Sequence, residues 1–184
     1  MAKKHVFISF GTPYSEPQRE FLKALLALLR KCNMEPRAVN MSEYPAESPL
    51  QVISRIMHEC DAAIIVAYER TYFDSGFEKR KSAQEKKLAS VRYTTPWNQI
   101  EAAMAYALDL PLIVMMETGL REEGLLEQNY DWSIERLSIT GDAFADKDVR
   151  GRIAAWCRHV QDDEPRRKAP APKRRSEKPP SRRR

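Results

Sequence analysis

One glutamate interrupts the apolar stretch TTPWNQIEAAMAYALDLPLIVMMETG, residues 94–119. Glu101 stands among alanines, one helical turn after Trp97, in a segment that predicts a helix followed by a buried strand. On a helical wheel of about 100° per residue, Glu101 falls at the rim of the apolar face, roughly in line with Trp97. The centre of that face consists of Ile100, Ala103, Met104 and Ala107.

A carboxylate at such a rim is partly desolvated, which raises its pKa, while the nearby helix N-terminus lowers it. A partly buried carboxylate of this kind can act in general acid–base or electrostatic catalysis. The residues alone leave a second interpretation open, in which Glu101 is an ordinary boundary glutamate that supports the helix.

Other sequence motifs of catalysis are absent. The chain has no GxGxxG, GxxxxGK[ST], HExxH or GxSxG pattern and no cysteine–histidine cluster. The three histidines, His5, His58 and His159, fall on separate predicted elements. We therefore expect no metal site, no dinucleotide fingerprint and no serine hydrolase.

Short apolar runs alternate with amphipathic segments, which is typical of a parallel α/β sheet. The predicted strands are 5–10, 35–39, 62–68, 110–116 and 134–139. The predicted helices are 17–31, 49–59, 95–108 and 146–161. This alternation predicts a flavodoxin-like three-layer domain with a five-stranded parallel sheet of order 2-1-3-4-5.

In such sheets, ligands bind beyond the carboxyl ends of the strands, where the strand order reverses. The loop after the first strand, with Phe10, Gly11 and Thr12, therefore lines the predicted crevice. Tyr68 and Glu69 after the third strand and the start of the 95–108 helix complete its lining.

The chain divides into a predicted α/β domain, 1–163, and a tail, 164–184. Within the domain, the charged segment 69–94 predicts a long excursion over the domain edge, either a lid or a solvated insertion. The tail carries ten Lys/Arg and two Asp/Glu, a net charge of +8. Because the whole chain has a net charge of +5, residues 1–163 have a net charge of −3. Its proline-rich basic composition predicts disorder, and the functional alternative is weak electrostatic contact with nucleic acid or with an acidic partner.

The three cysteines stand far apart, without a CxxC pair, which favours a reducing compartment. No signal peptide is evident, and no apolar run approaches the ~20 residues of a membrane span. We therefore expect a cytoplasmic protein without membrane contact.

Four segments resemble the TIR (Toll/interleukin receptor) family in their order along the chain. They are HVFISF, the EYPAESP loop, CDAAIIVAY and PWNQIEAAMAYALDLPLIVM. The most specific of them contains the W-x-x-x-E pattern of Trp97 and Glu101. The resemblance implies an NAD+ glycohydrolase or cyclase in which Glu101 is catalytic, acting in bacterial antiviral defence or stress signalling.

The same resemblance places Trp97 beside Glu101 in the pocket and makes the loop around Tyr44 and Pro45 the mobile loop for access and self-association. Asn98, which stands where many members have cysteine, joins the predicted substrate-binding set of Phe10, Gly11, Thr12, Tyr44, Trp97 and Asn98. NAD+ is expected as substrate, with no separate cofactor.

The loop GTPYSEP and the long 69–94 segment depart from the TIR pattern. These departures also fit the nucleoside 2-deoxyribosyltransferases, which this chain resembles in a first strand running into a Gly/Pro loop, SFGTP, and in a glutamate on a helix near the ribose. In that family the glutamate is the nucleophile at the anomeric carbon of the sugar. Both resemblances place an N-glycosidic bond at Glu101, where a carboxylate stabilises an oxocarbenium-like centre. A non-catalytic nucleotide-binding or TIR interaction module is the third interpretation.

Overall fold

The computed structural model describes residues 3–39, 48–128 and 132–163. Its main sheet has five parallel strands in the order β2-β1-β3-β6-β7. These strands are β1 (Lys4–Phe10), β2 (Met34–Arg37), β3 (Ala62–Ala67), β6 (Leu112–Glu117) and β7 (Ser133–Leu137). When only the five strands of this sheet are numbered in chain order, β6 and β7 become the fourth and fifth strands, and the order is the predicted 2-1-3-4-5. The flavodoxin-like fold class is therefore confirmed.

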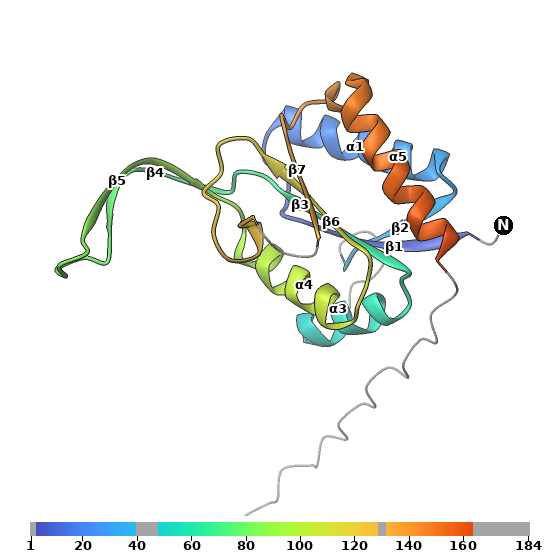
Figure 1. Ribbon diagram of the computed structural model, residues 1–184, viewed down its shortest axis with the longest axis horizontal. Helices are drawn as coiled ribbons and strands as arrows, with labels where there is room; N and C mark the ends of the chain where they lie inside the picture. The colour runs from blue at the N-terminus through green and yellow to red at the C-terminus, as the bar shows by residue number, and fades with distance from the viewer. Residues whose placement is uncertain (1–2, 40–47, 129–131, 164–184) are drawn as a thin grey trace, which may run out of the picture.

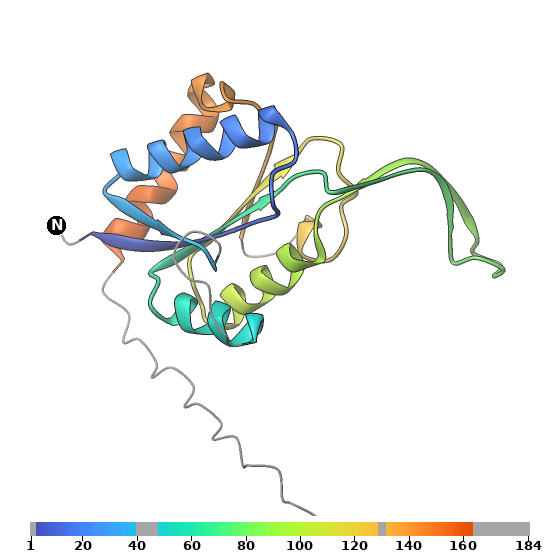
Figure 2. The same cartoon turned by 180° about the vertical axis from the view of Figure 1, so that it is seen from behind.

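Helices cover both faces of this sheet (Figure 1). They are α1 (Glu16–Lys31), α3 (Pro49–His58), α4 (Pro96–Ala107) and α5 (Lys147–Asp162), with short 3-10 turns η1 (Gly124–Leu126) and η2 (Ala143–Ala145). Helices α1 and α5 pack on one face, and α3 and α4 pack on the other (Figure 2). None of the helices in the described ranges has the length and apolar character needed to cross a bilayer.

Strand β3 shows why both faces must be covered. All of its residues are buried, and their side chains alternate between the two sides of the sheet. Ala62, Ile64 and Val66 belong to the core under α1 and α5. Ala63, Ile65 and Ala67 belong to the core under α3 and α4.

Local capping signals position the helices that border the carboxyl ends of the strands. The Ser15 side chain accepts the Gln18 N–H at the start of α1, and the Thr95 hydroxyl accepts the Trp97 N–H at the start of α4. A proline occupies the first turn of each helix, where its missing N–H costs no hydrogen bond. The start of the predicted 95–108 helix is thereby confirmed.

The excursion after β3 is an antiparallel hairpin, which we call the arm. Its strands are β4 (Thr71–Glu78) and β5 (Lys86–Tyr93), and they project away from the body of the domain (Figures 1 and 2). The sequence predicted an excursion here but no strands. The arm is solvated on both sides, so its residues show no run of buried apolar positions that indicates a strand.

Candidate functional site

Glu101 lies on the side of α4 that faces the sheet, against strand β1. The residue is only 9% exposed, and its carboxylate accepts a hydrogen bond from the Ser9 hydroxyl. Ser9 is the next-to-last residue of β1 and is itself buried, at 1% exposure. The carboxylate therefore lies near the carboxyl end of β1, the edge at which sheets of this class bind ligands.

A chain of side-chain hydrogen bonds orients Ser9. Thr94 Oγ1 donates to Asn98 Oδ1 at 2.6 Å, and Asn98 Nδ2 donates to Ser9 Oγ at 2.7 Å. Because the Ser9 oxygen already accepts from Asn98, its own proton is directed to Glu101. The relay runs from the residue before the α4 cap to the buried carboxylate.

The environment of Glu101 changes its ionisation. Burial raises the pKa of Glu101 to about 7, and the hydrogen bond from Ser9 opposes that rise. Within the described residues, no neighbouring charge contributes to this pKa. At neutral pH both the acid and the carboxylate form of the group are therefore populated.

The orientation of α4 differs from the helical-wheel prediction. The buried side of the helix consists of Asn98, Glu101, Ala102 and Ala105. Trp97 and Ile100 are exposed, at 43% and 40%. The predicted apolar centre at Ile100 is therefore wrong, and Glu101 lies within the buried face, not at its rim. Ala102 and Ala105 pack closely on the sheet, whereas the larger side chains of Trp97 and Ile100 remain outside.

The loop after β1 runs beside the start of α4. A Cβ on Gly11 would stand 3.6 Å from Thr95 Cγ2 and 3.7 Å from Tyr68 Cε2. The buried Tyr68 hydroxyl donates to the Gly11 carbonyl, which fixes this loop to the end of β3. Phe10 packs at the margin of the α1/α5 core, and Thr12 is exposed.

A polar cavity of about 450 Å³ opens at the same edge of the sheet, on the side of α1. Its lining comes from the start of α1, from the ends of β3 and β6, from the arm and from the loop after β7. The lining residues are Tyr14, Ser15, Pro17, Gln18, Glu69, Arg92, Glu117, Thr118, Ser138, Ile139 and Thr140.

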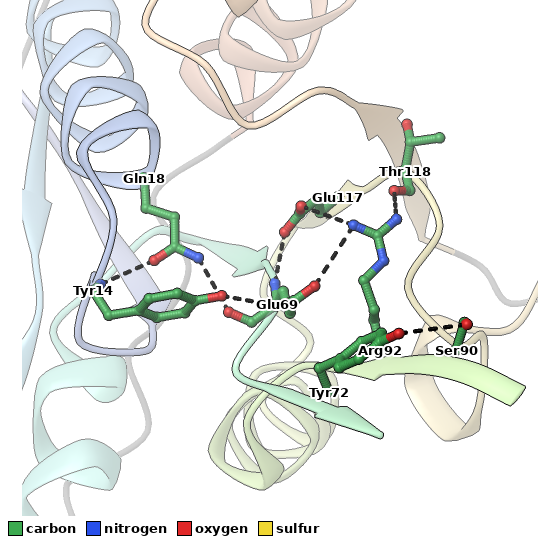
Figure 3. A network of polar contacts seen from close by, with 8 residues as sticks. All are labelled: Tyr14, Gln18, Glu69, Tyr72, Ser90, Arg92, Glu117 and Thr118. Atoms are coloured by element: carbon green, nitrogen blue, oxygen red, sulfur yellow. Dashed lines mark hydrogen bonds and ion pairs between the residues drawn. The ribbon is translucent and has the colours of Figure 1, made fainter. Parts of the chain in front are cut away.

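Two carboxylates and one guanidinium organise this cavity (Figure 3). Tyr14 donates its hydroxyl to Glu69 Oε1 at 3.0 Å, and the Glu69 backbone N–H donates to Glu117 Oε2 at 2.6 Å. Arg92 Nη1 lies 3.4 Å from Glu117 Oε1 and 3.7 Å from Glu69 Oε2. Arg92 Nη2 also donates to the Thr118 carbonyl at 2.7 Å, which fixes the base of the arm to the end of β6.

Glu101 and this cavity belong to different sides of the sheet. In β6, Ile113 and Met115 contribute to the α1/α5 core, and Glu117 continues that alternation. Ser9 and Glu101 instead lie between the sheet and α4. Glu101, Trp97, Asn98 and the loop residues 10–12 are not among the residues that line the cavity.

The predicted substrate-binding residues are therefore only partly brought together. Asn98 reaches Glu101 through Ser9, and Gly11 lies beside the α4 cap at Thr95. Trp97 precedes Glu101 by one turn but faces outward. Tyr44 lies outside the described residues, so its role stays a prediction. The described ranges contain no cluster of His, Cys, Asp or Glu suited to a metal ion.

Two side chains of the candidate site, Ser9 and Arg92, were not predicted from the sequence. Ser9 is the one hydroxyl-bearing residue in the apolar run VFISF and lies next to the end of the strand. A polar residue at that position could have indicated a site at this edge of the sheet. The sequence held no such signal for Arg92. Its contacts with Glu69 and Glu117 form only where the base of the arm meets the ends of β3 and β6.

No family model matches the sequence. No curated protein matches it either. Among solved structures, a CMP N-glycosidase from Clostridium botulinum superposes with a TM-score of 0.45 and 14% identity, covering 73% of this chain and 88% of that chain. The flavoenzyme NAD(P)H:(acceptor) oxidoreductase of Paracoccus denitrificans gives a TM-score of 0.46 and 12% identity, with 86% and 97% coverage. At these scores and identities, neither similarity assigns an activity to this chain.

Proposed function

We propose that this protein cleaves the N-glycosidic bond between nicotinamide and ribose in NAD+, with Glu101 as the catalytic carboxylate. The observation that carries the proposal is the buried position of Glu101 against Ser9, near the carboxyl end of β1. The W-x-x-x-E resemblance supports the same residue.

The chemistry requires a fixed negative charge beside C1′. The C1′–N bond breaks with its electron pair going to the pyridinium nitrogen, so that neutral nicotinamide leaves and the ribosyl group becomes oxocarbenium-like. A carboxylate held in a water-poor setting stabilises that cation strongly. Attack by water with loss of a proton yields ADP-ribose, whereas attack by the adenine nitrogen yields a cyclic product.

The surroundings of Glu101 favour a cationic substrate. A positive charge beside a buried carboxyl favours its ionised form, so NAD+ binding lowers the pKa of Glu101 from about 7 and generates the reactive carboxylate. Nicotinamide also leaves without protonation. The two groups that connect to Glu101, Ser9 and Asn98, are neutral and supply no strong acid.

Release of nicotinamide from NAD+ tests this function directly. We expect purified full-length protein to release nicotinamide, and Glu101→Gln to remove that activity while keeping the fold. Glu20→Gln, at an exposed position on α1, is the matched control and should retain full activity. Full activity of Glu101→Gln, or no release by the wild type across a wide range of protein concentrations, would overturn the proposal.

A second candidate follows from the protonated population of Glu101. A neutral base needs proton donation in order to leave, and a carboxyl with a pKa near 7 can supply it. This candidate is a nucleoside 2-deoxyribosyltransferase-like activity in which Glu101 protonates the leaving base, a different role from the nucleophilic glutamate of that family. Base exchange between a deoxynucleoside and free adenine, together with absence of nicotinamide release from NAD+, would select it.

A further inference from the structure

Two of the three cysteines lie side by side, although they come from distant parts of the sequence. Helices α1 and α5 share one face of the sheet (Figures 1 and 2). Cys32 directly follows α1, and Cys157 lies within α5. Their thiols contact each other through a side-chain hydrogen bond, and both side chains pack in the core between these helices and the sheet. The fold therefore creates a thiol pair that the spacing of the cysteines along the chain did not indicate.

The surrounding backbone fixes the position of this pair. The Cys32 N–H donates to the carbonyls of Leu28 and Leu29 at 3.1 and 3.0 Å, which holds Cys32 as the C-cap of α1. The side-chain amide of Gln161 donates to the Cys32 carbonyl. Gln161 lies one turn after Cys157 and therefore on the same side of α5. Two separate contacts thus join the end of α1 to this side of α5, one through the thiols and one through the amide.

The two thiols differ in their access to solvent. Cys157 is only 2% exposed, whereas Cys32 is partly exposed. Burial, together with the neighbouring Cys32 thiol, raises the pKa of Cys157 to about 12. A reagent in solution therefore reaches Cys32 first, and Cys157 reacts only with a sulfur that is already beside it.

The third cysteine is separated from this pair by the sheet. Cys60 comes just after α3 and belongs to the core under α3 and α4, on the opposite face from Cys32 and Cys157. It is also buried, at 3% exposure. Cys60 is thus an internal control within the chain, because selective oxidation of the thiol pair leaves it unchanged.

We propose that Cys32 and Cys157 form a reversible disulfide when the protein meets a peroxide, and that this bond fastens the end of α1 to α5. The Cys32 thiolate attacks one oxygen of hydrogen peroxide, the O–O bond breaks, and Cys32 sulfenic acid and water form. The Cys157 sulfur then attacks the Cys32 sulfur, the S–O bond breaks, and the departing hydroxide takes the Cys157 proton to give a second water. Two thiols are oxidised by two electrons in total, and one peroxide is reduced to two waters.

The same surroundings determine how the bond is reduced. A reducing thiolate reaches only the Cys32 sulfur, because Cys157 is buried. Attack there must expel the Cys157 thiolate, whose raised pKa makes it a slow leaving group. Reduction therefore proceeds slowly with a monothiol and requires a dithiol for completion. The inference concerns oxidation of these cysteines and does not depend on the proposed activity.

Mass spectrometry of the folded full chain tests the bond itself. After brief exposure to a small excess of hydrogen peroxide, the chain should lose the mass of two hydrogen atoms. Titration of thiols in denaturant should then fall from three per chain to one, and non-reducing peptide mapping should join Cys32 to Cys157 and find Cys60 unmodified. Dithiothreitol should restore all three thiols. Three thiols that persist after peroxide, a Cys32–Cys32 bond between chains, or a sulfinic acid at Cys32 would each overturn the proposal.

Single substitutions separate the two steps of the reaction. In Cys157→Ala, oxidation of Cys32 should stop at the sulfenic acid, which dimedone traps as a stable adduct. In Cys32→Ala, Cys157 should stay unmodified, because no sulfur beside it is oxidised. Cys60→Ala is the matched control and should form the bond as the wild type does. Unmodified Cys32 in Cys157→Ala, or loss of the bond in a folded Cys60→Ala, contradicts the assigned roles.

Thermal melting confirms that each variant is folded, and Cys157→Val replaces Cys157→Ala if the smaller side chain does not support the core. The wild type provides a further test without any substitution. In urea sufficient to unfold the chain, oxidation should also produce pairings with Cys60, since the sheet no longer separates the thiols. A mixture of pairings that is the same with and without urea would show that the fold does not select Cys32 and Cys157.

The effect of the bond on the folded protein is measured by melting the oxidised and the reduced wild type. A cross-link that spans most of the domain restricts the unfolded chain, so the oxidised form should melt about 5–15 °C higher. Dithiothreitol should abolish this difference, and peroxide should produce none in Cys157→Ala. A complete disulfide that leaves the melting temperature unchanged or lowers it would show that the bond does not fit the native contact of α1 with α5.

Discussion

Ser9 of β1 donates its hydroxyl to the Glu101 carboxylate of α4, and the same hydroxyl accepts from Asn98. Burial and this single hydrogen bond act on the pKa of Glu101 in opposite directions, and burial dominates. The helix start that directs the relay, from Thr94 to Asn98, is continuous with strand β5 of the arm. The hydrogen-bond relay that reaches Glu101 therefore begins where the arm joins the domain.

The first prediction concerns the pH dependence of stability. The folded pKa of Glu101 is about 7 and lies above its usual value of 4.5, so the folded state binds the proton more tightly. The stabilising contribution of the neutral form is present below about pH 4.5 and is lost as the pH rises toward 7. A shift of this size corresponds to about 3 kcal/mol as an upper bound.

Denaturant unfolding of wild type and Glu101→Gln from pH 4.5 to pH 8 measures this contribution. The amide does not ionise, so the variant should gain free energy of unfolding relative to wild type with rising pH, by up to about 3 kcal/mol. Any fixed cost of the buried amide cancels in this comparison across pH. A constant difference between the two proteins would show that the folded pKa of Glu101 is not raised.

The second prediction concerns Ser9→Ala. Loss of the hydroxyl removes the hydrogen bond that lowers the pKa of Glu101, so this pKa should rise further. If the carboxylate form carries the activity, the rising limb of the pH–rate profile moves to higher pH. Ser9→Thr keeps a hydroxyl and should restore the wild-type profile, whereas a purely structural role of Ser9 would lower the rate without moving the limb.

The side-chain carboxyl resonance of Glu101, assigned by its loss in Glu101→Gln, gives the same pKa without any substrate. An unchanged titration of this resonance in Ser9→Ala would contradict the proposed hydrogen-bond effect.

The sheet order was predictable because buried parallel strands leave a clear signal. The run AAIIVA is apolar throughout, as a strand covered on both faces must be, and Thr95-Pro96 marks the start of α4. The side of α4 that faces the sheet could not be predicted from the helical wheel. Alanines at 102 and 105 pack closely on the sheet, whereas the larger Ile100 lies outside, so hydrophobicity alone selected the wrong side.

The arm and the Arg92 network escaped sequence analysis for another reason. A solvated hairpin has no buried face and therefore no strong periodicity. The ion pairs of Arg92 with Glu69 and Glu117 join residues from three separate segments. Such pairs depend on tertiary structure, which local spacing does not report.

The third prediction concerns Gly11→Ala. A Cβ at this position makes ordinary contacts with Thr95 and Tyr68, at 3.6 and 3.7 Å, so the free energy of unfolding should change by less than about 1 kcal/mol. If ribose reaches Glu101 past the Gly11 backbone, the added methyl raises the KM for NAD+ severalfold. Pro13→Ala in the same loop serves as control. An unchanged KM would remove Gly11 from the substrate path without affecting the assignment of Glu101.

The last prediction concerns Gly119, where the chain turns after β6. Its φ of +89° favours glycine, and a Cβ there would stand 2.0 Å from Arg92 Nη2. Gly119→Ala must therefore displace the Arg92 guanidinium from the Thr118 carbonyl, to which it is bonded at 2.7 Å. Backbone strain and the lost charged hydrogen bond together predict destabilisation of about 2–3 kcal/mol.

Gly151→Ala is the matched control for Gly119→Ala, because Gly151 lies within α5 with no atom near its added Cβ, and there alanine should stabilise by about 0.5–1 kcal/mol. A double-mutant cycle with Arg92→Ala separates the two costs at Gly119. Once Arg92 is shortened, Gly119→Ala should retain only its backbone cost, so the two substitutions should be less than additive by about 1 kcal/mol. Strict additivity in urea unfolding would show that Arg92 does not occupy the space beside Gly119.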